Sequence, residues 1–116
     1  MPNYFSQSNR VWKEIYPGVR VSDLHRYPTG GGAALFAMEA GAAIPEHNHP
    51  TGEHGYVVEG EGLFGGQRLG EGDAFWMQIN EVHDIHAVTD LVFFCDIVAK
   101  KLMVLSPTLI SMQRRA

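Results

Sequence analysis

Short runs of alternating apolar and polar residues, separated by glycine-containing turns, make up most of the chain. Strand-like runs cover residues 11–16, 19–27, 33–40, 54–64, 67–69, 73–79, 82–88 and 91–101. Side chains on a strand alternate between two faces, so a period of two is typical of β-structure. No segment has the 3.6-residue apolar spacing of an amphipathic helix, although residues 106–116 could form a short helix or fray. The pattern predicts an all-β sandwich or barrel.

The length and composition describe one small globular domain. A chain of 116 residues has room for one core, which we expect over about residues 11–100, with peripheral tails at 1–10 and 106–116. With 9 basic and 13 acidic residues, the chain lacks the excess of Lys and Arg that nucleic acids or anionic membranes attract, so we expect neither as a partner. One cysteine excludes an internal disulfide framework. No apolar run is long enough to span a membrane, and residues 1–10 contain no signal core, so a cytoplasmic protein is expected.

Five of the six histidines fall in two tight clusters, which are His47, His49 and His54, and then His83 and His86. Residues i and i+2 of a strand share a face, so His47 and His49 can reach one ion. By the same alternation Glu53 shares the inward side with Val57, while His54 and His86 should face away. Three imidazoles and one carboxylate suit a divalent transition metal such as Fe, Mn, Ni, Zn, Co or Cu. Four protein ligands on an octahedral ion leave two positions for water or substrate, as in a catalytic site.

The same residues resemble a known family. Gly41, His47, His49, Glu53 and Gly60 reproduce the first cupin motif, Gly-x5-His-x-His-x3-Glu-x6-Gly. The second motif, Gly-x5-Pro-x-Gly-x2-His-x3-Asn, is matched at Gly72 and His83, whereas Gln78, Asn80 and Ala87 replace its Pro, Gly and Asn. The resemblance implies a double-stranded β-helix, which is the jelly-roll barrel of RmlC-like cupins. It also implies that His47, His49, Glu53 and His83 are the metal ligands. Cupins of this size are often dimers, so a homodimer is expected, and residues 11–16 are the candidate strand for pairing.

One acidic residue interrupts the last apolar strand. Asp96 is costly there unless it is paired or used. It either faces the barrel interior, where it could act as a general acid or base, or lies outside and pairs with another group. By alternation Phe94 shares its face and Cys95 takes the other, where a packing role is expected. The candidate substrate-binding residues are Arg20, Tyr56, Trp76, Gln78 and Phe94.

Three functions are compatible with these features. The chain is similar to small cupins that open unsaturated uronates in pectin and alginate breakdown. That likeness implies a metal-dependent enzyme of carbohydrate metabolism that isomerises or opens a small sugar acid or keto acid, with Asp96 as the catalytic residue. Three histidines and a glutamate are also a common ligand set of cupin dioxygenases, which makes a non-haem iron dioxygenase the first alternative. The chain also resembles the cupin domains of zinc-dependent anti-sigma factors, so the second alternative is a non-catalytic binding or regulatory module.

Overall fold

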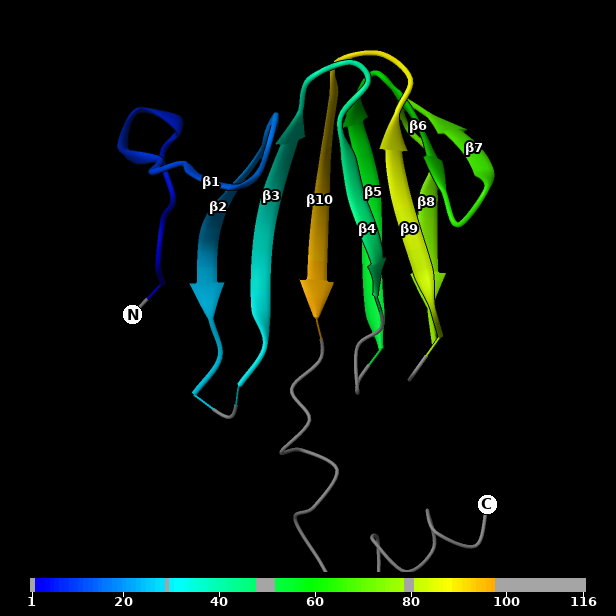
Figure 1. Ribbon diagram of the computed structural model, residues 1–116. Helices are drawn as coiled ribbons and strands as arrows, with labels where there is room; N and C mark the ends of the chain where they lie inside the picture. Colours follow the sequence, from blue (N-terminus) through cyan, green and yellow to red (C-terminus); the bar gives the residue numbers. More distant parts are fainter. Residues whose placement is uncertain (1, 29, 48–51, 79–80, 98–116) are drawn as a thin grey trace, which may run out of the picture.

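The computed structural model of the chain describes residues 2–28, 30–47, 52–78 and 81–97. Within these residues it has two antiparallel sheets, of six strands in the order β1-β2-β3-β10-β5-β8 and of four strands in the order β4-β9-β6-β7 (Figure 1). The strands are β1 (Lys13–Tyr16), β2 (Val19–Arg26), β3 (Gly32–Met38), β4 (Ala43–His47), β5 (Glu53–Glu59), β6 (Glu61–Phe64), β7 (Gln67–Gly70), β8 (Ala74–Met77), β9 (His83–Ala87) and β10 (Leu91–Ile97). The described helical structure is one 3-10 turn, Gln7–Asn9. The predicted all-β fold is therefore confirmed, while His49 and the tail 106–116 lie outside the described residues.

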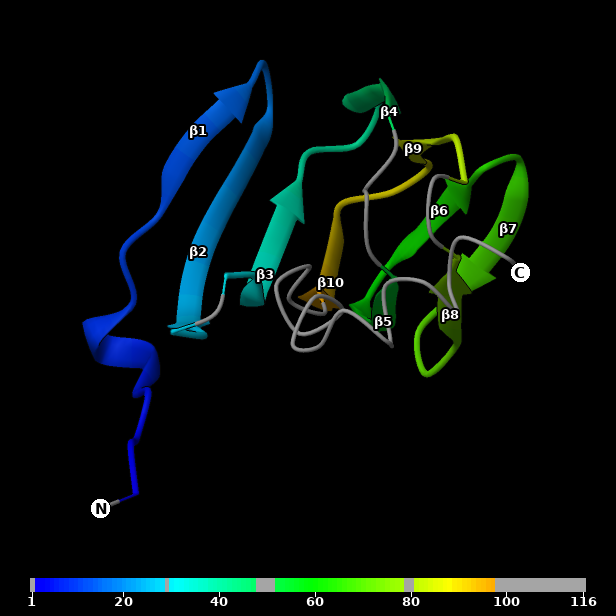
Figure 2. The same cartoon turned by 90° about the horizontal axis from the view of Figure 1, so that it is seen from below.

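The hydrophobic core lies between the two sheets. Seen from below, β4 and β9 face the strands β10 and β5 of the other sheet (Figure 2). Phe93 of β10 is at the centre of the core, with Phe36 stacked on it at 4.9 Å between ring centroids and Phe64 of the other sheet edge-on at 5.3 Å. Burial in β10 alternates along the strand, as the period of two predicts. Apolar side chains from both sheets therefore hold the sandwich together through one shared cluster.

The run 54–64, expected as one strand, is two strands in different sheets. β5 belongs to the six-stranded sheet and β6 to the four-stranded sheet, and Gly60 joins them with φ of +81°. A Cβ atom at this position would lie 1.9 Å from the carbonyl oxygen of Asp90. Only glycine accepts both the left-handed backbone and this close approach. Gly60 is therefore the point where the chain leaves one sheet for the other.

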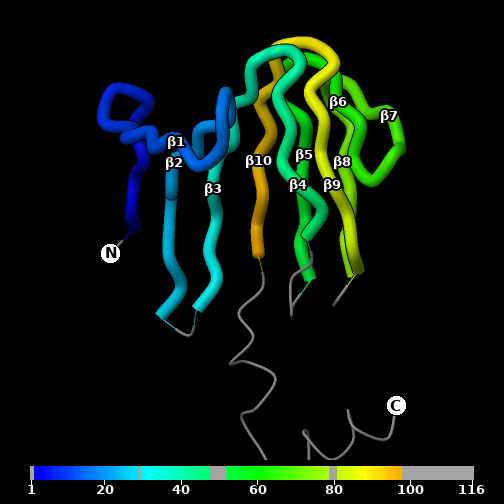
Figure 3. The backbone as a smooth tube through the Cα atoms, in the orientation of Figure 1, coloured from blue at the N-terminus to red at the C-terminus, as the bar shows by residue number. Residues whose placement is uncertain are grey.

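Strand β4 lies outside the strand-like runs expected from the sequence, and it contains Pro45. Proline cannot donate to a strand ladder, so it is confined to edge positions and irregularities. Among the described strands β4 is an edge strand that pairs with β9 alone, and its register shifts between Ile44 and His47. Both conditions that accommodate a proline are met here. The trace shows the chain passing from β3 over the end of the barrel into β4, in front of β5 (Figure 3).

The N-terminal segment lies against the outer side of β2. Tyr4, Phe5 and Val11 line one small cavity together with Ser22 and Leu24 of that strand. Strand β1 is the edge of the six-stranded sheet, and all four of its residues are exposed. Pairing of this edge with a second subunit stays a prediction. In the part of the chain that the structure describes, no helix has the length and apolarity to cross a membrane.

Candidate metal centre

Two histidines from neighbouring strands of the four-stranded sheet lie side by side. His47 ends β4 and His83 begins β9, and the register of the two strands places them opposite one another. Their ring centroids are 4.3 Å apart, and His83 is only 4% exposed. Opposed residues of an antiparallel pair point to the same face of a sheet, which here is the inner face. Strand register thus joins two residues that are 36 positions apart in the sequence.

Backbone hydrogen bonds hold both imidazoles in one tautomer. The Nδ1–H of His47 donates to the carbonyl oxygen of Pro45 at 2.8 Å, and the Nδ1–H of His83 donates to that of Glu81 at 3.2 Å. A carbonyl oxygen can only accept, so the proton of each neutral ring must be on Nδ1. The inward nitrogen, Nε2, is then the one with a lone pair. This is the tautomer in which a neutral histidine binds a metal ion through Nε2.

Glu53 brings a carboxylate to these histidines from the opposite sheet. It is the first residue of β5 and is only 4% exposed. Val57, four residues further on, is also buried, which confirms the predicted alternation. The Oε1 atom of Glu53 lies 3.9 Å from Nε2 of His83. A carboxylate and two imidazoles therefore converge from both sheets at one end of the barrel.

The chemistry of these donors fits a divalent transition metal, for which imidazole nitrogen and carboxylate oxygen are common ligands. Among the described residues, no three His, Cys, Asp or Glu side chains form a group that could hold an ion. In the described conformation His83 lies next to each of the other two donors, His47 and Glu53. The remaining predicted ligand, His49, falls outside these residues. The ligand set of His47, His49, Glu53 and His83 stays a prediction that the tautomers and the buried carboxylate support.

A cavity of about 240 Å³ opens beside these donors, and His47 and Glu53 form part of its wall. Tyr16 and Cys95 also line the cavity. Its apolar walls are Ile15, Phe36, Ile44, Ile85, Phe93 and Ile97. The sequence pattern did not reveal this wall, because it combines strands of both sheets.

Cys95 is buried in the wall next to Glu53. Burial raises the pKa of the Cys95 thiol well above its ordinary value, and the charge and hydrogen bonding of the Glu53 carboxylate act in the same direction. The group therefore stays a thiol near neutral pH, which argues against a nucleophile. The expected packing role agrees with this position.

The comparison with known families decides which family this fold represents. The model of the ChrR cupin-like domain family matches residues 3–99. The chain belongs to this family. Its predicted cupin fold is thereby confirmed, since both the family model and the two-sheet architecture agree with it. No curated protein matches the sequence.

Solved structures show the same cupin fold at low sequence identity. An RmlC-like cupin from Shewanella frigidimarina superposes with a TM-score of 0.77 at 20% identity, over 87% of this chain and 94% of that one. KdgF from Halomonas sp. has a TM-score of 0.73 at 24% identity, over 90% and 100% of the two chains. The anti-sigma factor ChrR of Rhodobacter sphaeroides, in its complex with SigE, has a TM-score of 0.71 at 23% identity. This chain covers 52% of that last one and is itself covered to 80%.

Asp96 lies on the outer face of the cupin's six-stranded sheet, away from the cavity. In the β10–β5 ladder Asp96 pairs with His54, which is exposed, and Ile97 pairs with the buried Glu53. Asp96 accepts a hydrogen bond of 2.6 Å from the Tyr27 hydroxyl. This bond is the main cause of a raised pKa of Tyr27. Of the two orientations that the sequence left open, the structure has the outward one, so the described geometry does not bring Asp96 to the predicted ligands.

The five predicted substrate-binding residues are not among those that line the cupin's cavity, and their role in substrate binding stays a prediction. Tyr56 and Trp76 are 49% and 46% exposed. The register pairs Phe94 with Tyr56, so alternation places all three on the outer face with Asp96. The Arg20 guanidinium lies over the ring of Trp12 at 5.2 Å, and Gln78 is exposed after β8.

The remaining histidines of the cupin lie apart from the predicted ligands. His54 packs on the Trp76 ring, with 4.5 Å between the centroids. Nε2 of His86 lies 3.0 Å from a carboxylate oxygen of Asp84. Both His54 and His86 are exposed, as the strand alternation predicts. His25 lines a second cavity, of about 220 Å³, that shares Phe36, Cys95 and Ile97 with the first.

Proposed function

We propose that this cupin is a metal-dependent enzyme that acts on a small oxygen-bearing substrate in the cavity beside Glu53. His47, His49, Glu53 and His83 would hold one divalent transition metal. The observation that carries the proposal is the convergence of two imidazoles, in the metal-binding tautomer, and a buried carboxylate beside a cavity. A metal ion there acts as a Lewis acid on a carbonyl, hydroxyl or carboxylate oxygen of the substrate.

The residues of the chain supply orientation and exclusion of water. The carbonyl groups of Pro45 and Glu81 fix the rings of His47 and His83 through their Nδ1 atoms. Such outer partners keep the ligand geometry and the tautomer constant. The apolar walls around Glu53 keep bulk water from the reacting atoms. These are the requirements of a site that performs chemistry on a bound small molecule.

Two reaction types remain compatible with this site. Isomerisation or ring opening of a sugar acid needs a group that moves a proton, and Asp96 lies on the outer face of the sheet. Tyr16 and Cys95 are further protic side chains in the wall, and Tyr16 is the candidate we favour because the raised pKa of Cys95 disfavours proton loss. The second reaction type is that of a non-haem iron dioxygenase. The apolar lining of the cavity favours this type, because it suits an apolar substrate.

The first experiment measures metal content by elemental analysis of purified protein. We expect about one equivalent per chain in the wild type and in His86→Ala, an exposed histidine on the same strand, and a loss of metal in His83→Ala. Circular dichroism verifies that each variant is folded. Full metal content in a folded His83→Ala variant, or none in the wild type, would contradict the proposed centre.

Turnover assays then separate the two reaction types. Loss of the unsaturated-uronate absorbance reports ring opening, and oxygen uptake with Fe(II) and a panel of diketones, thiols and phenols reports a dioxygenase. Metal-loaded protein should give one of these signals, and chelator-treated protein should give neither. If protein with one metal ion per chain gives neither signal, the proposal that this cupin is an enzyme is contradicted.

The second candidate function is a regulatory binding module. It is favoured by exposed apolar side chains on the outer face of the six-stranded sheet, namely Tyr56, Val58 and Trp76. Exposed apolar side chains that share one face of a sheet are compatible with a protein interface there. A stoichiometric protein that copurifies with the wild type but not with Trp76→Ser would support this candidate. If no protein copurifies and turnover is observed, the regulatory binding module is excluded.

A further inference from the structure

The six-stranded sheet extends past the four-stranded sheet that lies over it. Seen from below, β1 and β2 lie beyond the edge that β4 forms (Figure 2). The register places Val21 of β2 opposite Phe36 of β3, and Phe36 opposite the core residue Phe93, so all three face inward. Val21 and Phe36 are nevertheless only half-buried. Apolar surface in contact with water costs free energy in proportion to its area, so the inner face of β2 and β3 is suited to bind a further apolar segment.

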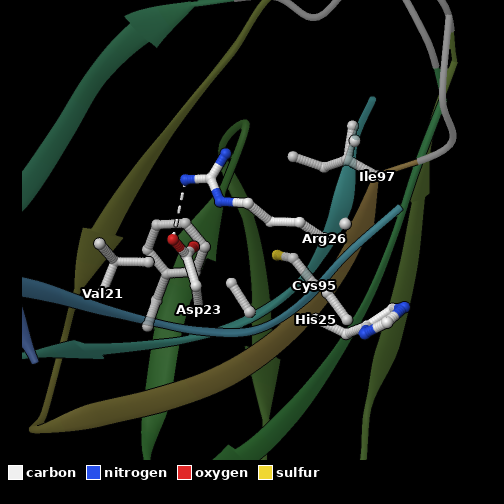
Figure 4. A pocket seen from close by; sticks show the side chains of 11 residues that line it. Val21, Asp23, His25, Arg26, Cys95 and Ile97 are labelled. Atoms are coloured by element: carbon white, nitrogen blue, oxygen red, sulfur yellow. Dashed lines mark hydrogen bonds and ion pairs between the residues drawn. The ribbon is translucent and has the colours of Figure 1, made fainter. Parts of the chain in front are cut away.

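Two adjoining cavities form one groove along this inner face. The cavity of about 220 Å³ reaches from β2 to β10, the cavity of about 240 Å³ reaches from β1 and β10 to the four-stranded sheet, and the two share Phe36, Cys95 and Ile97. Figure 4 shows Arg26 paired with Asp23 in the wall of the first cavity, with 2.9 Å between a guanidinium nitrogen and a carboxylate oxygen. The polar side chains of the groove that belong to one cavity each are Asp23, His25 and Arg26 in the first and Tyr16, His47 and Glu53 in the second. The shared middle of the groove thus has two apolar side chains and a thiol, with polar side chains on either side.

The chain continues directly out of this groove. Ile97 is the last residue of β10 and lines both cavities, and residues 98–116 follow it. The run 102–105 of this segment is entirely apolar, and further large apolar residues follow at Leu109, Ile110 and Met112. A segment that begins at the groove is present there at a high effective concentration, whereas a separate partner must bind from solution. Covalent connection therefore favours this segment as the occupant.

Charge favours the same pairing. Residues 98–116 contain four basic residues, Lys100, Lys101, Arg114 and Arg115, and no acidic one. Residues 1–97 hold the other 5 basic residues and all 13 acidic residues, which gives them a net charge of −8 with neutral histidines. A basic segment is attracted to an acidic body, and salt screens this attraction.

The segment is long enough to reach β2. The strand order β2-β3-β10 puts β2 two strand spacings, or about 10 Å, from the strand that ends at Ile97. The five residues from Ile97 to Leu102 span up to roughly 17 Å when they are extended. The apolar run 102–105 can therefore lie against Val21 and Phe36, in the part of the groove that extends past β4.

We propose that residues 98–116 bind in the groove on the inner face of β2 and β3 and close both cavities on that side. The apolar run 102–105 covers Val21 and Phe36, and the acidic body attracts the basic residues of the segment. A bound segment excludes water from the cavities, and it must move aside before a molecule can enter from this side. The inference goes beyond the proposed metal centre, and it holds whether or not an ion is bound there.

Photo-crosslinking in the full-length protein tests where the segment lies. p-Benzoylphenylalanine replaces Val21 in one variant and Arg26, an exposed residue of the groove, in a second. In the control it replaces Val58, which is 38% exposed on the outside of β5. Mass spectrometry then identifies the crosslinked peptides. We expect products of monomer mass in which position 21 or 26 is joined to residues 98–116, with a yield at least about fivefold above that from position 58, because only the groove positions contact the bound segment.

Substitutions in the segment test the apolar contact. Leu102→Ser together with Leu105→Ser should lower the crosslinking from position 21 by at least about fivefold, because each serine removes apolar surface that binding buries. Val88→Ser is the matched control, since Val88 is 40% exposed and follows β9, at the opposite end of β10 from Ile97. It should leave the crosslinking unchanged. Circular dichroism verifies that each variant is folded.

Other occupants of the groove, or other partners of the segment, give different products. Products of dimer mass from position 21 would assign the groove to a second copy of the chain and overturn the proposal. In a further arm, vesicles of equal parts phosphatidylcholine and phosphatidylserine are added, and we expect the crosslinking to be unchanged. Lost crosslinking in protein that sediments with the vesicles would assign the segment to an anionic lipid surface instead.

Two more results would overturn the proposal, namely products that do not include residues 98–116 and a yield that survives Leu102→Ser with Leu105→Ser. The metal content of the same protein is measured in parallel. Because the crosslinking does not require a metal, protein without metal that still gives the expected products contradicts the proposed function alone. Protein with metal that does not give them contradicts this inference alone.

Discussion

The buried carboxylate of Glu53 would link the proposed metal binding to stability, and one substitution can test this link. Glu53→Gln keeps the shape of the side chain and removes its charge. In metal-free protein the variant should melt no lower than the wild type, because burying an amide costs less than burying a carboxylate. With metal present the order should reverse, because an ion is then bound to the carboxylate. The same substitution therefore has opposite effects in the two states.

The magnitude follows from the size of the chain. A free metal concentration of 100 times the dissociation constant stabilises the folded state by about 2.7 kcal/mol. The entropy of unfolding is about 2.1 cal/mol/K per residue, so for 116 residues it is about 0.24 kcal/mol/K. The expected rise in the melting temperature of the wild type is about 11 °C. If the variant binds metal about 100-fold more weakly, as loss of a ligand or its outer partner can cause, its rise is about 2 °C.

The assay is differential scanning fluorimetry on chelator-treated protein, with and without Zn(II), Ni(II), Co(II) or Mn(II). Glu59→Gln is the matched control, because Glu59 is an exposed residue at the other end of the same strand. It should retain the full rise. A rise of about 11 °C in Glu53→Gln would refute the role of Glu53 as a ligand. A metal-free Glu53→Gln variant that melts several degrees below the wild type would refute the reasoning about its buried charge.

Three further outcomes follow from the described contacts. In metal-free protein the free energy of unfolding should fall with pH above about 8.5, by about 1.4 kcal/mol per unit, because the unfolded chain loses the Cys95 proton there while the raised pKa keeps the folded thiol protonated. Cys95→Ala should remove that slope in urea titrations between pH 8 and 9.5, and equal slopes would contradict the position of the thiol. Asp96→Asn should lower stability by about 1 kcal/mol through its bond to Tyr27 and leave metal content and turnover unchanged; lost turnover with normal metal would restore a catalytic role for Asp96. Gly60→Ala should destabilise the fold by at least about 2 kcal/mol more than Gly66→Ala, since Gly66 shares the positive φ but has open space where Gly60 meets the Asp90 carbonyl, and equal denaturation midpoints would contradict this.

The inward residues of single strands could be predicted from the sequence, because strand alternation is a local rule. Glu53 and Val57 were expected on one side and His54 on the other, and the burial of β5 follows that pattern. The division of the run 54–64 could not be predicted in the same way. Glycine within a strand-like run can mark a bulge or a bend as well as the end of a strand, and only the contact with Asp90, 30 residues later, makes Gly60 obligatory. Strand β4 was missed for a related reason, since Pro45 argues against a strand except at a sheet edge, and an edge is a property of the assembled sheet.

The orientation of Asp96 shows what additional information a strand pattern requires. Alternation groups Asp96 with Phe94 and separates it from Cys95, but it does not say which group faces inward. The register of β10 with β5 supplies the answer. It pairs Ile97 with the buried Glu53, so Ile97 faces inward and its neighbour Asp96 faces outward. A long-range pairing of this kind also brings together two of the predicted ligands, His47 and His83. The metal donors could be named from a motif, whereas the cavity wall depends on the mutual register of strands in both sheets.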